Sequence, residues 1–136
     1  MPYDPARHPA PRSLGKEERL SREVLLDKLF SEGKSVSQNG FTLVYLECTL
    51  PTFYPAQAAF SVPKKYFKHA TDRNRVKRLL REAYRHEKQA LYMLLATAHK
   101  QLALMWIYKG KEVPAHAIVQ KNVSELLAKL QARVIR

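Results

Sequence analysis

Arginine and lysine side chains are concentrated in one stretch of the chain, residues 71–85, which contains no glycine or proline. Four of them, Arg73, Lys77, Arg81 and Arg85, follow one another at intervals of four residues. In a helix this interval places successive cations along one edge, about 6 Å apart. That separation is close to the spacing of phosphates along a nucleic acid strand, and guanidinium groups form forked hydrogen bonds with phosphate oxygens. The chemistry that this stretch indicates is the binding of a polyanion.

The same stretch also carries apolar residues at helical spacing: Val76, Leu79, Leu80 and Ala83. One apolar face and one charged face predict an amphipathic helix. We expect it to run from about Asp72, whose carboxylate is suited to cap the first turn, to near His99. The cations would then project from the face opposite the core.

Other elements must position this helix. The apolar spacing and glycine placement predict a first helix from Ser21 to Gly33, and β-branched and aromatic residues predict a strand over 41–48. A second strand over about 57–62 is expected to pair antiparallel with it, and an apolar run predicts a strand over 102–108. A last helix is expected beyond Pro114. This order predicts an α+β fold, an α/β sandwich in which three helices pack on one face of a small mixed sheet.

Bulk properties restrict the function further. The chain has 136 residues, a formal net charge of +12 and a pI near 10.0, which favours nucleic acid or an anionic membrane surface as partner. No apolar run approaches the roughly 20 residues of a membrane span, so we expect a soluble, cytoplasmic protein. Residues 1–18, rich in proline and basic residues, are predicted to form a disordered arm before one domain over 19–136. The single Cys48 is interpreted as a half-buried thiol.

Candidate catalytic groups are scarce. The acidic residues are few and dispersed, and the five histidines lack the spacing of metal ligands. Glu82 and Glu87 lie between cations and are interpreted as their charge partners. The sequence therefore predicts no catalytic residue and no metal site in the protein itself.

The residues around the basic stretch resemble a known signature. Ser61-Val62-Pro63-Lys64-Lys65 precedes the string Arg73-Asn74-Arg75-x-Lys77-Arg78-x-x-Arg81-Glu82. This resembles the protein subunit of bacterial ribonuclease P, and the resemblance extends from Arg19 to the C-terminus. It implies that the following residues bind RNA: Arg73, Asn74, Arg75, Lys77, Arg78, Arg81, Lys64 and Lys65. The four-residue spacing adds Arg85 to this set.

The resemblance carries further expectations about fold and function. It implies a fold like ribosomal protein S5 domain 2, with a left-handed strand-helix-strand crossover that the usual right-handed preference argues against. It also implies a cleft for the single-stranded 5′ leader of precursor tRNA, lined on the first helix by Leu26 and Phe30. Phe30 matches the aromatic residue expected there, whereas Leu26 departs from it. A core role for both residues is an alternative interpretation.

The expected partners follow from the same resemblance. They are ribonuclease P RNA, in a 1:1 complex, and precursor tRNA, with magnesium ions bound mainly by the RNA subunit, which performs the hydrolysis. A structural RNA-binding protein of the ribosome is the alternative, because the same charge and a related fold would permit it. A major-groove DNA binder and a membrane-surface protein are less favoured by the pattern.

Overall fold

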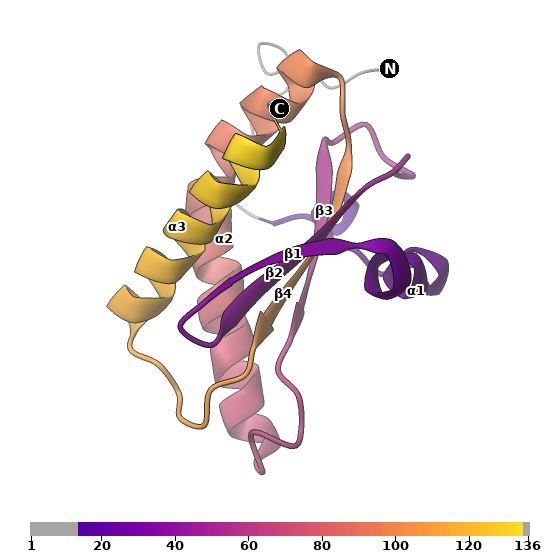
Figure 1. Ribbon diagram of the computed structural model, residues 1–136. Coiled ribbons are helices and arrows are strands. Elements are labelled where there is room, and N and C mark those ends of the chain that lie inside the picture. Colours follow the sequence, from indigo (N-terminus) through magenta and orange to yellow (C-terminus); the bar gives the residue numbers. More distant parts are fainter. Residues whose placement is uncertain (1–13, 135–136) are drawn as a thin grey trace.

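The computed structural model describes residues 14–134, which form a four-stranded sheet with helices on both faces (Figure 1). Two helices, α2 and α3, cover one face of the sheet, and the short helix α1 lies on the other. In chain order the elements are η1 (Lys16–Glu18), α1 (Glu23–Glu32), β1 (Lys34–Gln38), β2 (Phe41–Glu47), β3 (Ala56–Ser61), α2 (Ala70–Ala98), β4 (Leu102–Tyr108) and α3 (His116–Val134). The α+β class and the three helices were predicted correctly, but the prediction that all helices pack on one face is wrong, because α1 packs on the other face against Ala103 and Met105.

The strand order in the sheet is β1-β2-β4-β3. β2 pairs antiparallel with β1 and with β4, whereas β3 pairs parallel with β4. The predicted antiparallel pair between the strands at 41–48 and 57–62 is therefore wrong, because β4 lies between them. Since parallel neighbours need a long connection, α2 serves as the crossover from β3 to β4. The strand-helix-strand unit is confirmed, and its left-handedness stays a prediction.

The sequence interpretation did not resolve β1 as a separate strand. It is an edge strand in which only Val36 is buried, so it lacks the apolar alternation of a half-buried strand. A tight turn joins it to β2, with positive φ at Asn39 (51°) and Gly40 (84°). These are the residue types that tolerate the left-handed conformation of a type I′ hairpin. Asn39 and Gln38 both donate to the buried Oδ1 of Asn122, so the hairpin is joined to α3.

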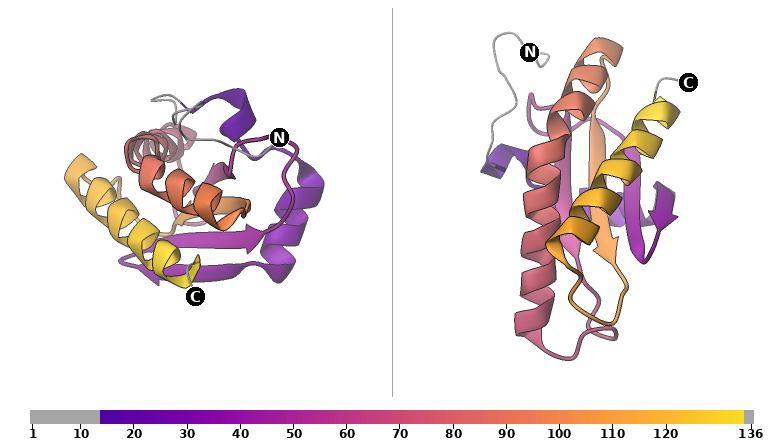
Figure 2. Two further views of the ribbon diagram at one scale, coloured as in Figure 1. Left: turned by 90° about the horizontal axis from the view of Figure 1, so that it is seen from above. Right: turned by 90° about the vertical axis from the view of Figure 1, so that its left-hand side faces the viewer.

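Alternate residues of the strands supply two separate apolar clusters. Leu43 of β2 and Trp106 of β4 point towards α2 and α3 into the larger cluster. Ala103 and Met105 of β4 point the other way and pack with Leu29 of α1 in the smaller cluster. Figure 2 shows this arrangement from above, with α2 and α3 on one side of the strands and α1 on the other. The smaller cluster leaves part of the second sheet face accessible.

Helix α2 begins earlier than predicted and ends where predicted. Its N-cap is His69, which makes no side-chain capping hydrogen bond, so Asp72 lies within the first turn instead of capping it. A negative charge there still interacts favourably with the helix dipole. At the other end His99 adopts a left-handed conformation (φ 55°) that terminates the helix.

The folded domain begins before the predicted boundary at residue 19. Residues 1–13 of the expected arm lie outside the described residues, but residues 14–18 are packed against the domain. Leu14 belongs to the larger cluster, and Glu18 in η1 is 1% exposed. The error arose because a charged segment is held by polar contacts that no hydrophobic pattern reveals. Among residues 14–134, no helix is both long and apolar enough to cross a bilayer.

Candidate nucleic-acid interface

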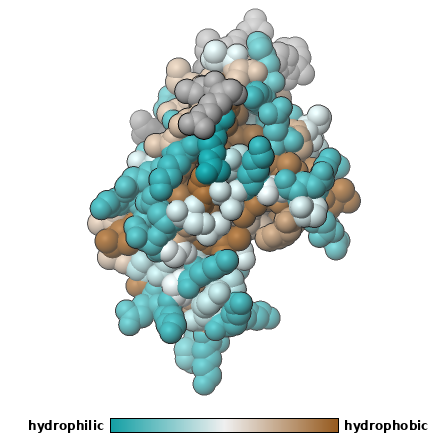
Figure 3. Space-filling model, in the orientation of Figure 1, coloured by the Kyte–Doolittle hydropathy of each residue, from teal (hydrophilic) through white to brown (hydrophobic). Residues whose placement is uncertain are grey.

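The predicted cations gather at one end of the molecule. Lys64 and Lys65 lie in the loop that follows β3, and the first five turns of α2 carry the others. Figure 3 shows hydrophilic side chains at the lower end of the molecule, where Figure 1 places the start of α2. The crossover connection produces this grouping, since it returns the chain from the end of β3 directly into α2. The exposed members of the predicted set are Lys64, Lys65, Asn74, Arg75, Arg78 and Arg81.

Three of the predicted residues are half-buried, and two of these have partners within the protein. The guanidinium of Arg73 donates to the carbonyl oxygens of Phe67 (2.8 Å) and Lys68 (3.4 Å). Arg73 thus fixes the loop that leads into α2. Lys77 is also half-buried. Because a guanidinium has five N–H donors, the loop contacts leave Arg73 with further donors.

Arg85 is the third half-buried cation, and it pairs with Glu82 one turn earlier. The hydrogen bond from Arg85 lowers the pKa of the Glu82 carboxyl, and the charges of Arg85 and His86 act in the same direction. The interpretation of Glu82 as a charge partner is confirmed. Glu87 instead accepts a hydrogen bond from Gln120 of α3 (2.6 Å).

Arg81 occupies a defined position although it is exposed. Its guanidinium carbon lies 5.7 Å from the ring centroid of Phe60 in β3, at cation–π distance. Lys65 has a similar relation to the neighbouring Tyr66, at 5.1 Å. These contacts orient the charged groups without neutralising them. Within residues 14–134, Arg85 is the only member of the predicted set with an acidic partner.

The two residues predicted to line the leader cleft differ in their surroundings. Leu26 is half-buried and packs against the smaller cluster, as do Val44 and Ile107 of the sheet. Phe30 is 60% exposed, which is unusual for a phenylalanine. The core interpretation therefore applies to Leu26 in part and does not apply to Phe30. One helical turn separates the two residues, so both lie on the same side of α1.

The sequence interpretation missed a buried polar group between η1 and α2. Oε1 of Glu18 accepts hydrogen bonds from Nζ of Lys88 (2.5 Å) and from the hydroxyl of Tyr92 (2.6 Å), and its Oε2 accepts from the backbone of Gly15. Burial lowers the pKa of Lys88, while the hydrogen bond and charge of Glu18 oppose that shift. Lys88 follows Arg85 by three residues, so its position in the sequence does not distinguish it from the exposed cations of α2.

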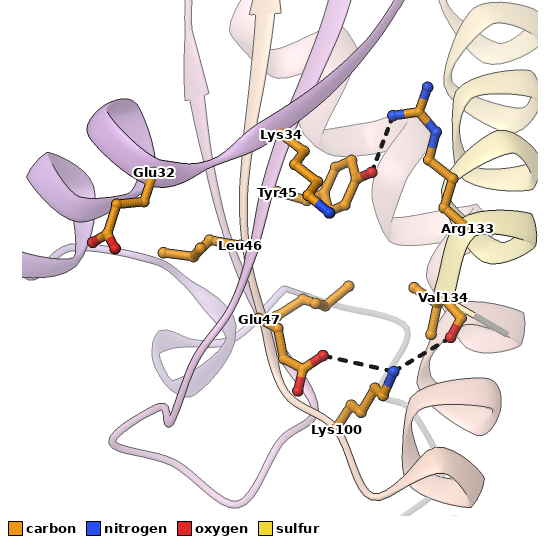
Figure 4. Close-up of a pocket in the computed structure, with 9 residues that line it drawn as sticks. Glu32, Lys34, Tyr45, Leu46, Glu47, Lys100, Arg133 and Val134 are labelled. Atoms are coloured by element: carbon orange, nitrogen blue, oxygen red, sulfur yellow. Dashed lines mark hydrogen bonds and ion pairs between the residues drawn. The ribbon is translucent and has the colours of Figure 1, made fainter. Parts of the chain in front are cut away.

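A separate pocket of about 720 Å³ lies at the opposite end of the sheet (Figure 4). Its polar lining pairs internally, since Arg133 donates to the hydroxyl of Tyr45 and Lys100 lies 3.6 Å from Glu47. Lys34 and Glu32 complete the charged lining. Among the described residues, no three histidine, cysteine, aspartate or glutamate side chains form a group able to hold a metal ion. The predicted RNA-binding residues are absent from this pocket.

The fold and the cationic end of α2 define a class of protein: a small α+β protein that presents a basic helix to a polyanion. Comparison with known sequences specifies the family. The chain belongs to the ribonuclease P protein family, because the family model described as Ribonuclease P matches residues 14–131. The resemblance seen in the sequence is thereby confirmed.

Individual relatives support this assignment. The ribonuclease P protein component of Chlorobium phaeobacteroides is 38% identical over 125 residues, covering 85% of this chain and 86% of that protein. That of Porphyromonas gingivalis is 31% identical over 126 residues, covering 93% and 92%. Among solved structures, the RNase P protein from Thermotoga maritima has a TM-score of 0.60 at 27% identity, over 85% of this chain and 96% of that chain. A Staphylococcus aureus RNase P protein shares the fold, with a TM-score of 0.67 at 20% identity, over 89% of this chain and 100% of that one.

Proposed function

We propose that this protein binds the catalytic RNA of ribonuclease P through the cationic end of α2, and that it binds the 5′ leader of precursor tRNA through α1 and the accessible sheet face. The observation that carries the proposal is the exposed group of cations around α2 whose charge is not neutralised within the described domain. Family membership supplies the identity of the RNA.

The α2 surface is suited to bind a phosphate backbone because its charges are exposed, close together and partly oriented. Arg78 and Arg81 lie about one turn apart, and the aromatic ring of Phe60 holds Arg81 in place. Each cation that contacts a phosphate releases condensed counterions, so binding depends steeply on salt concentration. Asn74 is exposed beside Arg75, and its amide can both donate and accept a hydrogen bond.

The leader surface depends on stacking in addition to charge. An exposed aromatic ring such as Phe30 can stack on an unpaired base irrespective of sequence. Leu26 extends the apolar surface beside it, and Val44 and Ile107 supply the adjoining sheet face. This arrangement fits a single strand whose bases are not paired. Lys64 and Lys65 would neutralise phosphates of either RNA.

The chemical step is assigned in this proposal to the RNA subunit, with magnesium ions bound mainly by that RNA. The protein contributes by reducing phosphate repulsion, which raises the affinity for precursor tRNA and for the metal ions at low magnesium concentration. We propose a 1:1 complex in the cytoplasm. A structural role in the ribosome would use the same charge, but the family assignment favours ribonuclease P.

The test is cleavage of a 5′-labelled precursor tRNA by bacterial ribonuclease P RNA at low magnesium concentration, with and without the full chain. Accurate leader removal only when RNA and protein are both present supports the proposal. Cleavage by the protein alone, or an absence of stimulation with several RNA subtypes, would contradict it. A variant with Arg78→Ala and Arg81→Ala provides the matched loss-of-function comparison.

A further inference from the structure

The segment from Leu14 to Leu20, here called the strap, lies along the edge of β3 and carries Arg19, an exposed arginine outside the basic stretch at residues 71–85. The backbone amide of Leu20 donates to the carbonyl of Ala58 (3.0 Å), and Arg19 forms a parallel bridge with the same residue. The side chain of Gln57 donates to the carbonyl of Glu17 (3.0 Å). The strap therefore extends the sheet by a short additional pairing beyond β3.

This pairing determines the side of the sheet to which Arg19 belongs. Side chains of residues that pair across neighbouring strands lie on the same face, and Ala58 belongs to the cluster beneath α2 and α3. Leu20, the next residue, belongs to the cluster beneath α1. Arg19 thus shares the face of the sheet on which α2 lies, whereas Leu26 and Phe30 lie on the other face.

Arg19 is also close to the cationic edge of α2. Arg81 lies over Phe60, which follows Ala58 by two residues on the same face of β3, or about 7 Å along the strand. The strap is displaced from β3 by one strand spacing, about 5 Å. The guanidinium Nε of Arg19 donates to the carbonyl of Leu14 (3.2 Å), and Arg19 forms no ion pair with any residue between 14 and 134.

The buried group around Glu18 fixes this position. Glu18 and Lys88 are each 1% exposed, and their ion pair joins the strap to α2 directly beside Arg19. A buried pair of this kind holds one geometry, because displacing either partner leaves an uncompensated charge. The strap consequently has a defined register relative to the helix that carries the other cations.

From these relationships we infer that Arg19 is a further RNA-binding residue, which contacts a phosphate of the same RNA as α2, and that Glu18 and Lys88 are its positioning residues. The inference rests on the proposed function. Since Arg19 lies on the α2 face, its phosphate belongs to the catalytic RNA and not to the leader, which the proposal places on the α1 face.

The test measures the salt dependence of binding between the full chain and ribonuclease P RNA. Arg19→Ala is expected to reduce the slope of log affinity against log salt by about 0.7 to 0.9, one phosphate contact, while Arg19→Lys preserves it. Lys121→Ala, an exposed charge on α3, is the matched control and should not change the slope. The double variant Arg78→Ala with Arg81→Ala separates a failure of the Arg19 contact from a failure of RNA binding by α2. Loss of slope there but not with Arg19→Ala overturns this inference alone, whereas no loss in either overturns the proposed function.

Two further experiments test which RNA supplies the phosphate and whether Glu18 and Lys88 position Arg19. Arg19→Ala should weaken the affinity of the holoenzyme for precursor tRNA by the same factor whether the leader is long or short. An effect that grows with leader length would overturn the assignment to the catalytic RNA. In a background with Glu18→Ala and Lys88→Met, which removes the pair without leaving a buried charge, Arg19→Ala should no longer change the slope. The same loss in both backgrounds would show that the pair does not position Arg19, and circular dichroism confirms that each variant is folded.

Discussion

The carboxylate of Glu18 and the ammonium group of Lys88 lie 2.5 Å apart, and the two residues are 70 positions apart in the chain. Both side chains are 1% exposed, so the pair is desolvated almost completely. The attraction between the charges must therefore offset the cost of burying both. This balance makes the pair sensitive to the loss of either partner.

Glu18→Ala is expected to lower the free energy of unfolding by about 3 to 5 kcal/mol, because it removes the buried carboxylate that pairs with the ammonium group of Lys88. Urea denaturation measures this change. Combining Glu18→Leu with Lys88→Met should recover most of the stability, since an apolar pair of similar volume avoids the desolvation cost. Glu125→Ala on α3, an exposed site, is the control and should change stability by less than about 0.5 kcal/mol. A loss for Glu18→Ala no larger than that of the control would contradict the buried pair.

Arg78→Ala together with Arg81→Ala should weaken binding to ribonuclease P RNA without unfolding the protein, because both residues are exposed. Two lost phosphate contacts reduce the salt slope by about 1.4 to 1.8 in total. Filter binding at several salt concentrations measures the slope. Lys34→Ala with Lys121→Ala removes the same charge outside the loop after β3 and the basic face of α2, and is expected to preserve the slope. Equal slopes for both double variants would mean that only net charge matters.

Phe30→Ala should weaken the binding of precursor tRNA by about 1 to 3 kcal/mol, the value of stacking on one base, with little effect on mature tRNA. Because Phe30 is 60% exposed, the stability of the protein should hardly change. Leu26→Ala provides the contrast, since its half-buried side chain belongs to the smaller cluster and its loss should destabilise the fold. Affinities of the holoenzyme for the two tRNAs, measured beside thermal unfolding, separate these effects. Equal losses for both tRNAs with Phe30→Ala would argue against a leader contact.

The thiol of Cys48 should react slowly with iodoacetamide at neutral pH. Burial raises the pKa of this thiol above its ordinary value, and the opposing effects of a backbone hydrogen bond and Lys28 are smaller. Only the thiolate is nucleophilic, so the midpoint of the rate against pH should lie above that of a free cysteine. Because the chain has one cysteine, mass spectrometry measures this rate without interference. After denaturation in urea the midpoint should return to the ordinary range.

The sequence predicted those elements whose own residues carry a clear pattern, and it did not predict how distant elements pair. Helix α2 was predictable because apolar and basic residues alternate along it at helical spacing, and β4 because it is continuously apolar. The pairing of β3 was not predictable, because the connection from β2 to β3 is long enough for β4 to lie between these two strands. Strand β1 was missed because an edge position buries only Val36.

The types and spacing of the predicted site residues located the cationic end of α2. They could not show which contacts those residues make within the protein. Arg73 also fixes the preceding loop through two backbone carbonyls, which no spacing rule reveals. Lys88 is the sharpest case. It lies within one helical turn of Arg85, and only the contact of the strap with α2 shows that it is buried.

Because α2 is long, substitutions in its two halves are expected to have different effects. Its 29 residues span about 44 Å, and both ends are tied to strands of the same sheet, β3 and β4. The first half carries all the predicted cations of α2 except Arg85, whereas the second half contacts α3 through Glu87 and the strap through Lys88. A substitution that disturbs the packing of the second half can therefore tilt the whole helix. A tilt of a few degrees would displace all the cations at the N-terminal end together. Such variants would lose RNA affinity while keeping each arginine and lysine in place.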